Sequence, residues 1–121
     1  MNNPILQIKK AGDVCVVRID SKKLYQNEAA RFREEMMVLL GKSCRSLVLD
    51  MSEVRVMNSS AIGVVLLVSD QLKKKNGKFA VGGLSPLLKE LFERMYLNTL
   101  FDVADTPEQA VSLIQNAGQN P

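Results

Sequence analysis

The chain has 121 residues, of which 46% are hydrophobic, and this is enough apolar material for one core of ordinary size. It carries a net charge of +3 and contains no histidine, which excludes serine–histidine and cysteine–histidine catalysis as well as histidine metal sites. We therefore expect a single domain over residues 1–121, with a flexible tail from about residue 118.

No segment of the sequence predicts a membrane anchor or a bound cofactor. The apolar runs are shorter than the roughly 20 residues that span a bilayer, and the N-terminus lacks the basic-then-apolar order of a secretion signal. Cys15 and Cys44 are too few and too far apart to predict a zinc cluster or a disulfide framework, so we expect two buried small hydrophobic residues. The expected location is the cytoplasm.

The first part of the chain predicts a hairpin, a helix and a buried strand. Residues 5–9 and 14–19 are β-branched runs joined by a short turn, which predicts two antiparallel strands. Apolar residues then recur at helical spacing between Asn27, a candidate N-cap, and Gly41, which suits a helix C-terminus. Residues 46–50 form a short continuous apolar run, which is typical of a strand buried on both faces.

Residues 59–75 are ambiguous on propensity alone, because their valines favour a strand. The apolar runs on either side, 46–50 and 78–84, favour a helix, since two parallel strands need a crossover of about a dozen residues or more, usually helical. We therefore predict a helix over 59–75, with Asn58 or Ser59 as its N-cap.

The last part of the chain predicts two more helices around a short edge strand. Ser85 and Pro86 suit the cap and first residue of one helix, and Thr106 begins the last helix with a capping-box spacing. Residues 99–103 between them are expected to form the edge strand. The predicted fold is a small α/β layer structure with a mixed sheet of four to five strands and about four helices.

Two adjacent serines, Ser59 and Ser60, lie at the start of the ambiguous helix. In open α/β sheets, functional groups gather where a strand ends and a helix begins. One interpretation is a structural cap, although Asn58 can take that role and leave Ser59 free. A catalytic serine is disfavoured, because GxSxG is absent and no histidine can take the proton. The third interpretation is a phosphorylation switch, since a helix N-terminus tolerates a phosphate whose charge disrupts a protein interface.

The helix after the serine pair has more apolar surface than a crossover helix needs. It is apolar nearly all the way round, whereas one buried stripe is enough to pack on a sheet. Some of these side chains are therefore expected to face a partner, unless flanking helices cover them. The residues expected to contact a partner share the start and the outer side of this helix: Asn58, Ser59, Ser60, Ala61, Val64, Leu67 and Val68.

The order of motifs over residues 46–111 is specific when it is taken together. An apolar strand leads into an acidic-x-Ser turn that begins at Asp50, and an apolar position then precedes the serine pair. After the serine pair come an apolar helix, a glycine turn and another strand. The positions in register are Val54, Val56, Met57, Ser59, Ser60, Ile62, Gly63, Asn76, Gly77, Leu97 and Phe101. This order resembles the STAS domain of anti-sigma factor antagonists.

The resemblance implies a partner-switching mechanism and no enzymatic activity. The unphosphorylated antagonist binds an anti-sigma serine kinase with a histidine-kinase-like ATPase fold, and this frees the sigma factor for transcription. The kinase phosphorylates the first serine of the pair, which is Ser59 on this chain, with Ser60 as the alternate. Phosphorylation releases the antagonist, and a PP2C-type phosphatase resets it.

Two positions depart from the family pattern. Asn58 stands where the family has an acidic residue, so it keeps a capping amide but loses a charge that the kinase complex can use. Ala61 stands where the family has glycine, and it adds a Cβ where a partner approaches. These departures leave open an alternative function, in which the chain is an unphosphorylated STAS scaffold or a sensing module within a signalling complex.

The isoelectric point of about 9.0 leaves nucleic-acid binding as a further alternative. The lysines come in small groups at 9–10, 22–23 and 73–75, and none is interleaved with aromatic residues. Lysines at the end of a helix offset its dipole, so the pattern favours solvated lysines over a nucleic-acid partner. A small hydrolase is a remote fourth alternative, because no nucleophile elbow is present.

Overall fold

The computed structural model describes residues 3–117, and the flexible tail expected from about residue 118 lies outside them. The elements in chain order are β1 (Leu6–Ala11), β2 (Val14–Ile19), β3 (Lys23–Leu24), α1 (Gln26–Leu40), β4 (Ser46–Asp50), β5 (Val56–Met57), α2 (Ser59–Lys74), β6 (Lys78–Gly82), α3 (Pro86–Arg94), the 3-10 helix η1 (Leu97–Thr99), β7 (Asp102–Ala104) and α4 (Pro107–Ala117). Among the described residues, every helix is too short or too polar to cross a membrane.

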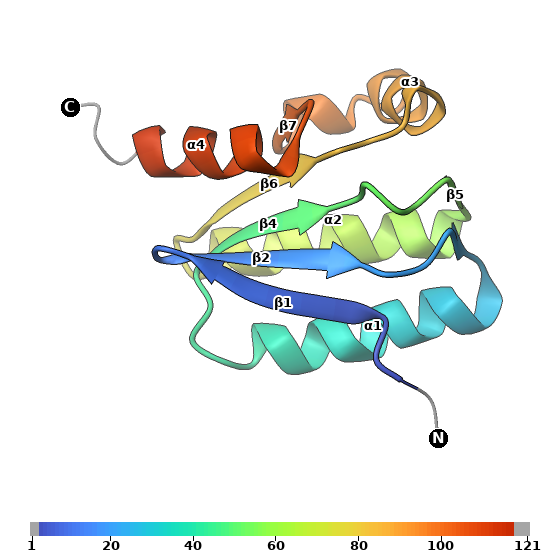
Figure 1. The fold of residues 1–121 in the computed structure, drawn as a ribbon, viewed down its shortest axis with the longest axis horizontal. Coiled ribbons are helices and arrows are strands. Elements are labelled where there is room, and N and C mark those ends of the chain that lie inside the picture. Colours follow the sequence, from blue (N-terminus) through green and yellow to red (C-terminus); the bar gives the residue numbers. More distant parts are fainter. Residues whose placement is uncertain (1–2, 118–121) are drawn as a thin grey trace.

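Five strands form one mixed sheet in the order β1-β2-β4-β6-β7. β1 and β2 make the predicted antiparallel hairpin, whereas β2, β4, β6 and β7 run parallel to one another. The helices α1 and α2 cover one face of the sheet and α4 covers the other (Figure 1). The predicted α/β fold class is therefore confirmed, and the crossover over residues 59–75 is the predicted helix, α2.

The central strand β4 is buried because helices lie on both faces of the sheet. Leu47, Val48 and Leu49 are all fully buried. Leu47 and Leu49 belong to the larger core beneath α1 and α2, whereas Val48 belongs to the smaller core beneath α4. Successive side chains of a strand point to opposite faces, so a strand covered on both faces must be apolar throughout.

The boundaries that differ from the expectation include those of α1 and β7. α1 begins at Gln26 with Tyr25 as its N-cap, because the carbonyl oxygen of Tyr25 accepts the N–H of Glu28, and Asn27 therefore lies inside the helix. The edge strand β7 begins at Asp102, later than expected, because the preceding residues close the 3-10 helix η1.

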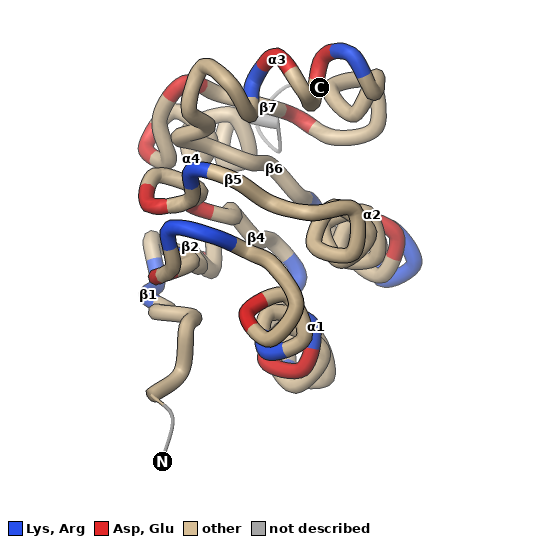
Figure 2. The backbone as a smooth tube through the Cα atoms, turned by 90° about the vertical axis from the view of Figure 1, so that its right-hand side faces the viewer, with Lys and Arg blue, Asp and Glu red and all other residues tan. Residues whose placement is uncertain are grey.

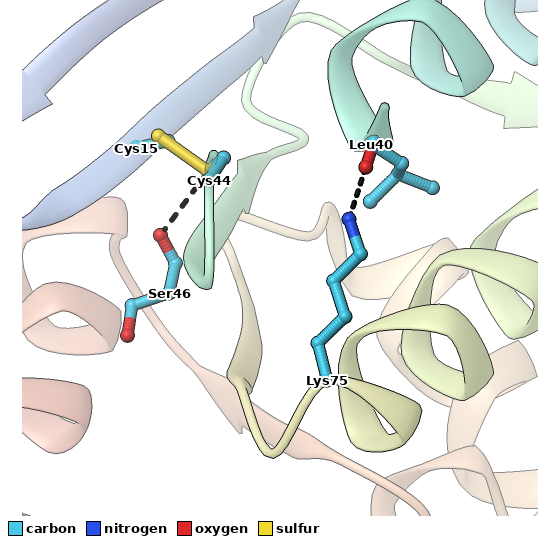
Figure 3. Close-up of a disulfide and its surroundings, with 5 residues drawn as sticks. All are labelled: Cys15, Leu40, Cys44, Ser46 and Lys75. Carbon is cyan, nitrogen blue, oxygen red and sulfur yellow. Dashed lines mark hydrogen bonds between the residues drawn. A yellow bond between two sulfur atoms is a disulfide. The ribbon is translucent and has the colours of Figure 1, made fainter. Parts of the chain in front are cut away.

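Cys15 and Cys44 form a disulfide, which corrects the expectation of two separate buried residues. Figure 3 shows Cys15 on β2 and Cys44 in the segment that leads into β4. Because β2 pairs with β4, Cys15 lies beside Leu47, and the Cα atoms of the two cysteines are 6.5 Å apart, within the usual range for a disulfide. Both cysteines are buried, as expected. Strand pairing thus joins residues that are 29 positions apart in the sequence.

Candidate functional site

A second, two-stranded sheet places the starts of α1 and α2 side by side. β3 pairs in parallel with β5, so Leu24 lies opposite Met57. Both side chains are buried, and the N–H of Asn58 donates to the carbonyl oxygen of Leu24 at 3.0 Å. Each helix begins two residues after its strand, so two helix N-termini lie at the same edge of the molecule. Strands of this length have no periodicity, so the sequence predicts neither of them.

Asn58 is the N-cap of α2. Its backbone is extended, and its Oδ1 accepts a hydrogen bond from the N–H of Ala61 at 3.0 Å. Its carbonyl oxygen accepts the first intrahelical bond, from the N–H of Ile62 at 3.1 Å. The sequence allowed either Asn58 or Ser59 as the cap, and the structure assigns this role to Asn58. The hydroxyl of Ser59 therefore has no capping role.

Ser59 and Ser60 are exposed in the first turn of α2. Within residues 3–117, neither hydroxyl makes a hydrogen bond to another protein group, and both backbone N–H groups lie before the first intrahelical bond. Unpaired N–H groups and the positive end of the helix dipole stabilise an anion at this position. The geometry is therefore compatible with a phosphate on Ser59 in the folded chain.

The outer side of α2 is less apolar than expected. Val64 and Val68 are buried in the larger core, so the expectation that these two side chains face a partner is wrong. The physical reason is that α2 packs against the sheet on one side and against α1 on another, which Figure 2 shows end-on. Ala61 is also fully buried, so its methyl group does not project toward a partner. Leu67 is half-buried and remains at the surface.

Gly63 lies on the exposed side of α2, one turn after Ser59. Among residues 3–117, no neighbouring segment or side chain lies within 4 Å of the position that a Cβ would occupy. A glycine in a helix interior costs about 1 kcal/mol relative to alanine. The fold thus gains nothing from the absence of a side chain at Gly63, which leaves a flat, open strip of backbone next to Ser59.

Three exposed basic residues border the two helix N-termini. Lys22 and Lys23 lie before α1, and Arg55 lies immediately before β5. The N–H of Arg55 donates to the carbonyl oxygen of Lys22 at 2.8 Å, so the two segments touch, and Figure 2 shows basic positions on both. A cavity of about 480 Å³ beside them is lined by Lys23, by the start of α1 and by Asn58. These charges add to the positive potential of the helix ends.

The lysines at the other end of α2 serve the fold. The Nζ of Lys75 donates to the carbonyl oxygen of Leu40 at the end of α1 (Figure 3). Lys74 forms an ion pair with Asp70 one turn earlier, at 3.2 Å. Lys73 and Lys74 are exposed, as expected for a solvated helix end, whereas Lys75 is half-buried.

The family of the chain follows from a comparison with known domains. The family model of the STAS domain matches residues 6–110, which extends the resemblance of residues 46–111 over nearly the whole chain. The chain belongs to the STAS domain family of anti-sigma factor antagonists. A relative from Bordetella bronchiseptica, named "Putative anti-sigma factor antagonist BtrV", is 30% identical over 89 residues, which cover 74% of this chain and 77% of the relative.

Solved structures of STAS proteins share the fold. An anti-sigma factor antagonist from Mycobacterium paratuberculosis superposes with a TM-score of 0.82 at 20% identity, over 91% of this chain and 92% of that one. The Bacillus cell fate determinant SpoIIAA in its phosphorylated form superposes with a TM-score of 0.69 at 18% identity, over 90% of this chain and 98% of that one. At these identities the likeness establishes the architecture.

Proposed function

We propose that this STAS domain is a non-enzymatic, cytoplasmic anti-sigma factor antagonist that works by partner switching. Unphosphorylated, it binds an anti-sigma serine kinase with a histidine-kinase-like ATPase fold and so frees a sigma factor for transcription. The kinase phosphorylates Ser59, the antagonist dissociates, and a PP2C-type phosphatase resets it. The single observation that carries the proposal is the exposed, uncommitted hydroxyl of Ser59 at the N-terminus of α2.

The first step of the proposal is that the folded chain accommodates the phosphate. Asn58 caps the helix through its own side chain, so phosphorylation of Ser59 removes no capping bond. The free N–H groups of the first turn and the basic residues Lys22, Lys23 and Arg55 all favour the added negative charge. The monomer therefore keeps its fold in both states.

The second step is that the same phosphate opposes docking. The surface around Ser59 is formed by Ser60, Gly63 and the half-buried Leu67, and it carries no acidic side chain in the first turn of α2. A partner that lies against the backbone at Gly63 would seal Ser59 from water. A phosphate with roughly −1.5 to −2 charges cannot be buried there without a compensating partner group. The absence of a side chain at Gly63, which the fold does not require, leaves room for such a partner.

Relatives support this proposal through what their names state. SpoIIAA has been solved in both an unphosphorylated and a phosphorylated form. The departures at Asn58 and Ala61 bear less on the site than the sequence suggested, because Asn58 supplies the cap and the methyl group of Ala61 is buried. The proposed phosphoacceptor is therefore Ser59, with Ser60 as the alternate.

The experiment is phosphate mapping by mass spectrometry. The protein is incubated with ATP and with the anti-sigma serine kinases of its own organism, and Ser59→Ala and Ser60→Ala are the matched variants. The proposal expects phosphate on Ser59, loss of the label in Ser59→Ala and retention in Ser60→Ala. The contrary result is a stable complex with a kinase, with or without ATP, in which Ser59 carries no phosphate. It would instead support the scaffold function, which is favoured by Asn58 standing where the family has an acidic residue.

A further inference from the structure

The sheet has an open edge at β1, which pairs with β2 and with no other strand in the described part of the chain. The N–H of Asp20 donates to the carbonyl oxygen of Ile5 at 2.6 Å, so the carbonyl group of Ile5 faces β2. Backbone groups alternate in direction along an antiparallel strand, and those of Leu6, Ile8 and Lys10 therefore face outward. An exposed edge of this kind is a template for another strand.

An apolar groove runs beside this edge, between β1 and α1. It measures about 480 Å³, and its floor is formed by Leu6 and Leu39. Ile8 and Val38 form its walls with 52% and 64% of their surface exposed, so two aliphatic side chains from different elements stand together in water. Covering them would stabilise a complex by the burial of apolar surface.

We propose that this face binds a second copy of the chain across a twofold axis. Val38 lies midway between Glu34 and Lys42, four residues from each, and all three line the groove. A twofold axis close to Val38 places Glu34 of each copy opposite Lys42 of the other and brings the two Val38 side chains together. Both charged residues are exposed and belong to none of the ion pairs within residues 3–117.

The strand register of β1 is compatible with the same axis. Consider two β1 strands, one from each copy, that pair antiparallel with Ile8 at the centre. Ile8 of one copy then faces Ile8 of the other, Gln7 faces Lys9 of the other copy, and Leu6 faces Lys10 of the other copy. No lysine then lies opposite a lysine, whereas a centre on Lys9 would bring two lysines together. Ile8 and Val38 line one groove, so a single axis serves both the strand and the helix.

The free hydrogen-bonding groups of β1 fit this register. The carboxylate of Glu35 already accepts the N–H groups of Ile5 and Leu6, at 3.1 and 3.0 Å. The outward donors that remain are the N–H groups of Ile8 and Lys10. In the dimer, Ile8 exchanges two hydrogen bonds with Ile8 of the second copy, and the N–H of Lys10 reaches the carbonyl oxygen of Leu6 of that copy, whereas the N–H of Leu6 stays bonded to Glu35. This inference does not depend on the function proposed for Ser59.

The test is the oligomeric state of the full chain by sedimentation equilibrium, from micromolar to millimolar concentration. The structure predicts a reversible dimer that Val38→Asp abolishes. The matched control is Leu87→Asp, which places the same charge on a residue that is 62% exposed on α3 and should leave dimerisation unchanged. A chain that is monomeric at every concentration, or a dimer that survives Val38→Asp, would overturn the proposal.

Charge exchange tests the axis itself. Glu34→Lys and Lys42→Glu should each weaken the dimer about tenfold or more, because each variant sets two like-charged pairs across the axis. An equimolar mixture of the two variants should dimerise as tightly as the unaltered chain, since both cross-axis pairs then have opposite charge. A mixture that associates no better than either variant alone would refute the twofold arrangement. Circular dichroism confirms that each of these surface variants is folded.

Discussion

Ser59→Asp places a fixed negative charge at the site where we propose a phosphate. The side chain of Ser59 caps nothing and makes no hydrogen bond to the protein within residues 3–117, so the substitution removes no stabilising contact. It adds a charge in the first turn of α2, where the helix dipole and the free N–H groups stabilise an anion by about 0.3–1 kcal/mol. We expect the free energy of unfolding to stay constant or to rise by that amount.

The measurement is urea unfolding at low and high salt. Ser112→Asp is the matched control, because Ser112 is an exposed serine in the middle of α4, where the dipole has no comparable effect. Ser59→Asp should be more stable than Ser112→Asp by about 0.5 kcal/mol at low salt, and the difference should shrink as salt screens the dipole. A loss of more than about 1 kcal/mol in Ser59→Asp would show that the serine is packed and would refute the reasoning.

Three further predictions concern the cap, the open helix face and the disulfide. Asn58→Ala should lower the free energy of unfolding by about 1 kcal/mol, whereas Asn58→Asp should leave it unchanged. Thermal melting measures the difference, and equal melting temperatures of the two variants would contradict the capping role of Asn58. Gly63→Ala should raise the free energy of unfolding by up to about 1 kcal/mol and yet weaken kinase binding in a titration. A Gly63→Ala variant that binds the kinase as tightly as the unaltered chain would argue against a partner that lies against the backbone at Gly63. A thiol reductant should destabilise the chain by about 3.5 kcal/mol, because the Cys15–Cys44 bridge closes a loop of 29 residues. A Cys44→Ala variant should not respond to the reductant. Equal denaturation midpoints of the unaltered chain with and without reductant would contradict this prediction.

The sequence was sufficient for the main elements because most of them have a strong local signal, and the strands on either side of residues 59–75 identify that segment as a helical crossover. The β-branched hairpin, the apolar run at 46–50 and the length of the crossover at 59–75 were enough to predict the sheet and α2. The position of Ser59 followed from the same pattern, since a strand and a helix of known order place their junction at one edge of the sheet.

The features that the sequence did not show depend on residues that are distant along the chain. Val64 and Val68 look like surplus apolar surface on one helix, and they are buried because α2 packs against both the sheet and α1. Cys15 and Cys44 meet only because β2 pairs with β4. The basic segment at Lys22–Lys23 lies beside the segment that leads into α2 because β3 pairs with β5, and strands of two residues are too short for any periodic signal.

Isothermal titration of the anti-sigma serine kinase with the two forms of the chain tests the central proposal most directly. One form is unphosphorylated and the other carries a phosphate on Ser59, and melting curves confirm that both are folded. Burying an unpaired charge in an interface costs about 2–5 kcal/mol, so phosphorylation should weaken binding by roughly 30-fold to more than 1,000-fold. Equal affinity of the two folded forms would contradict the account.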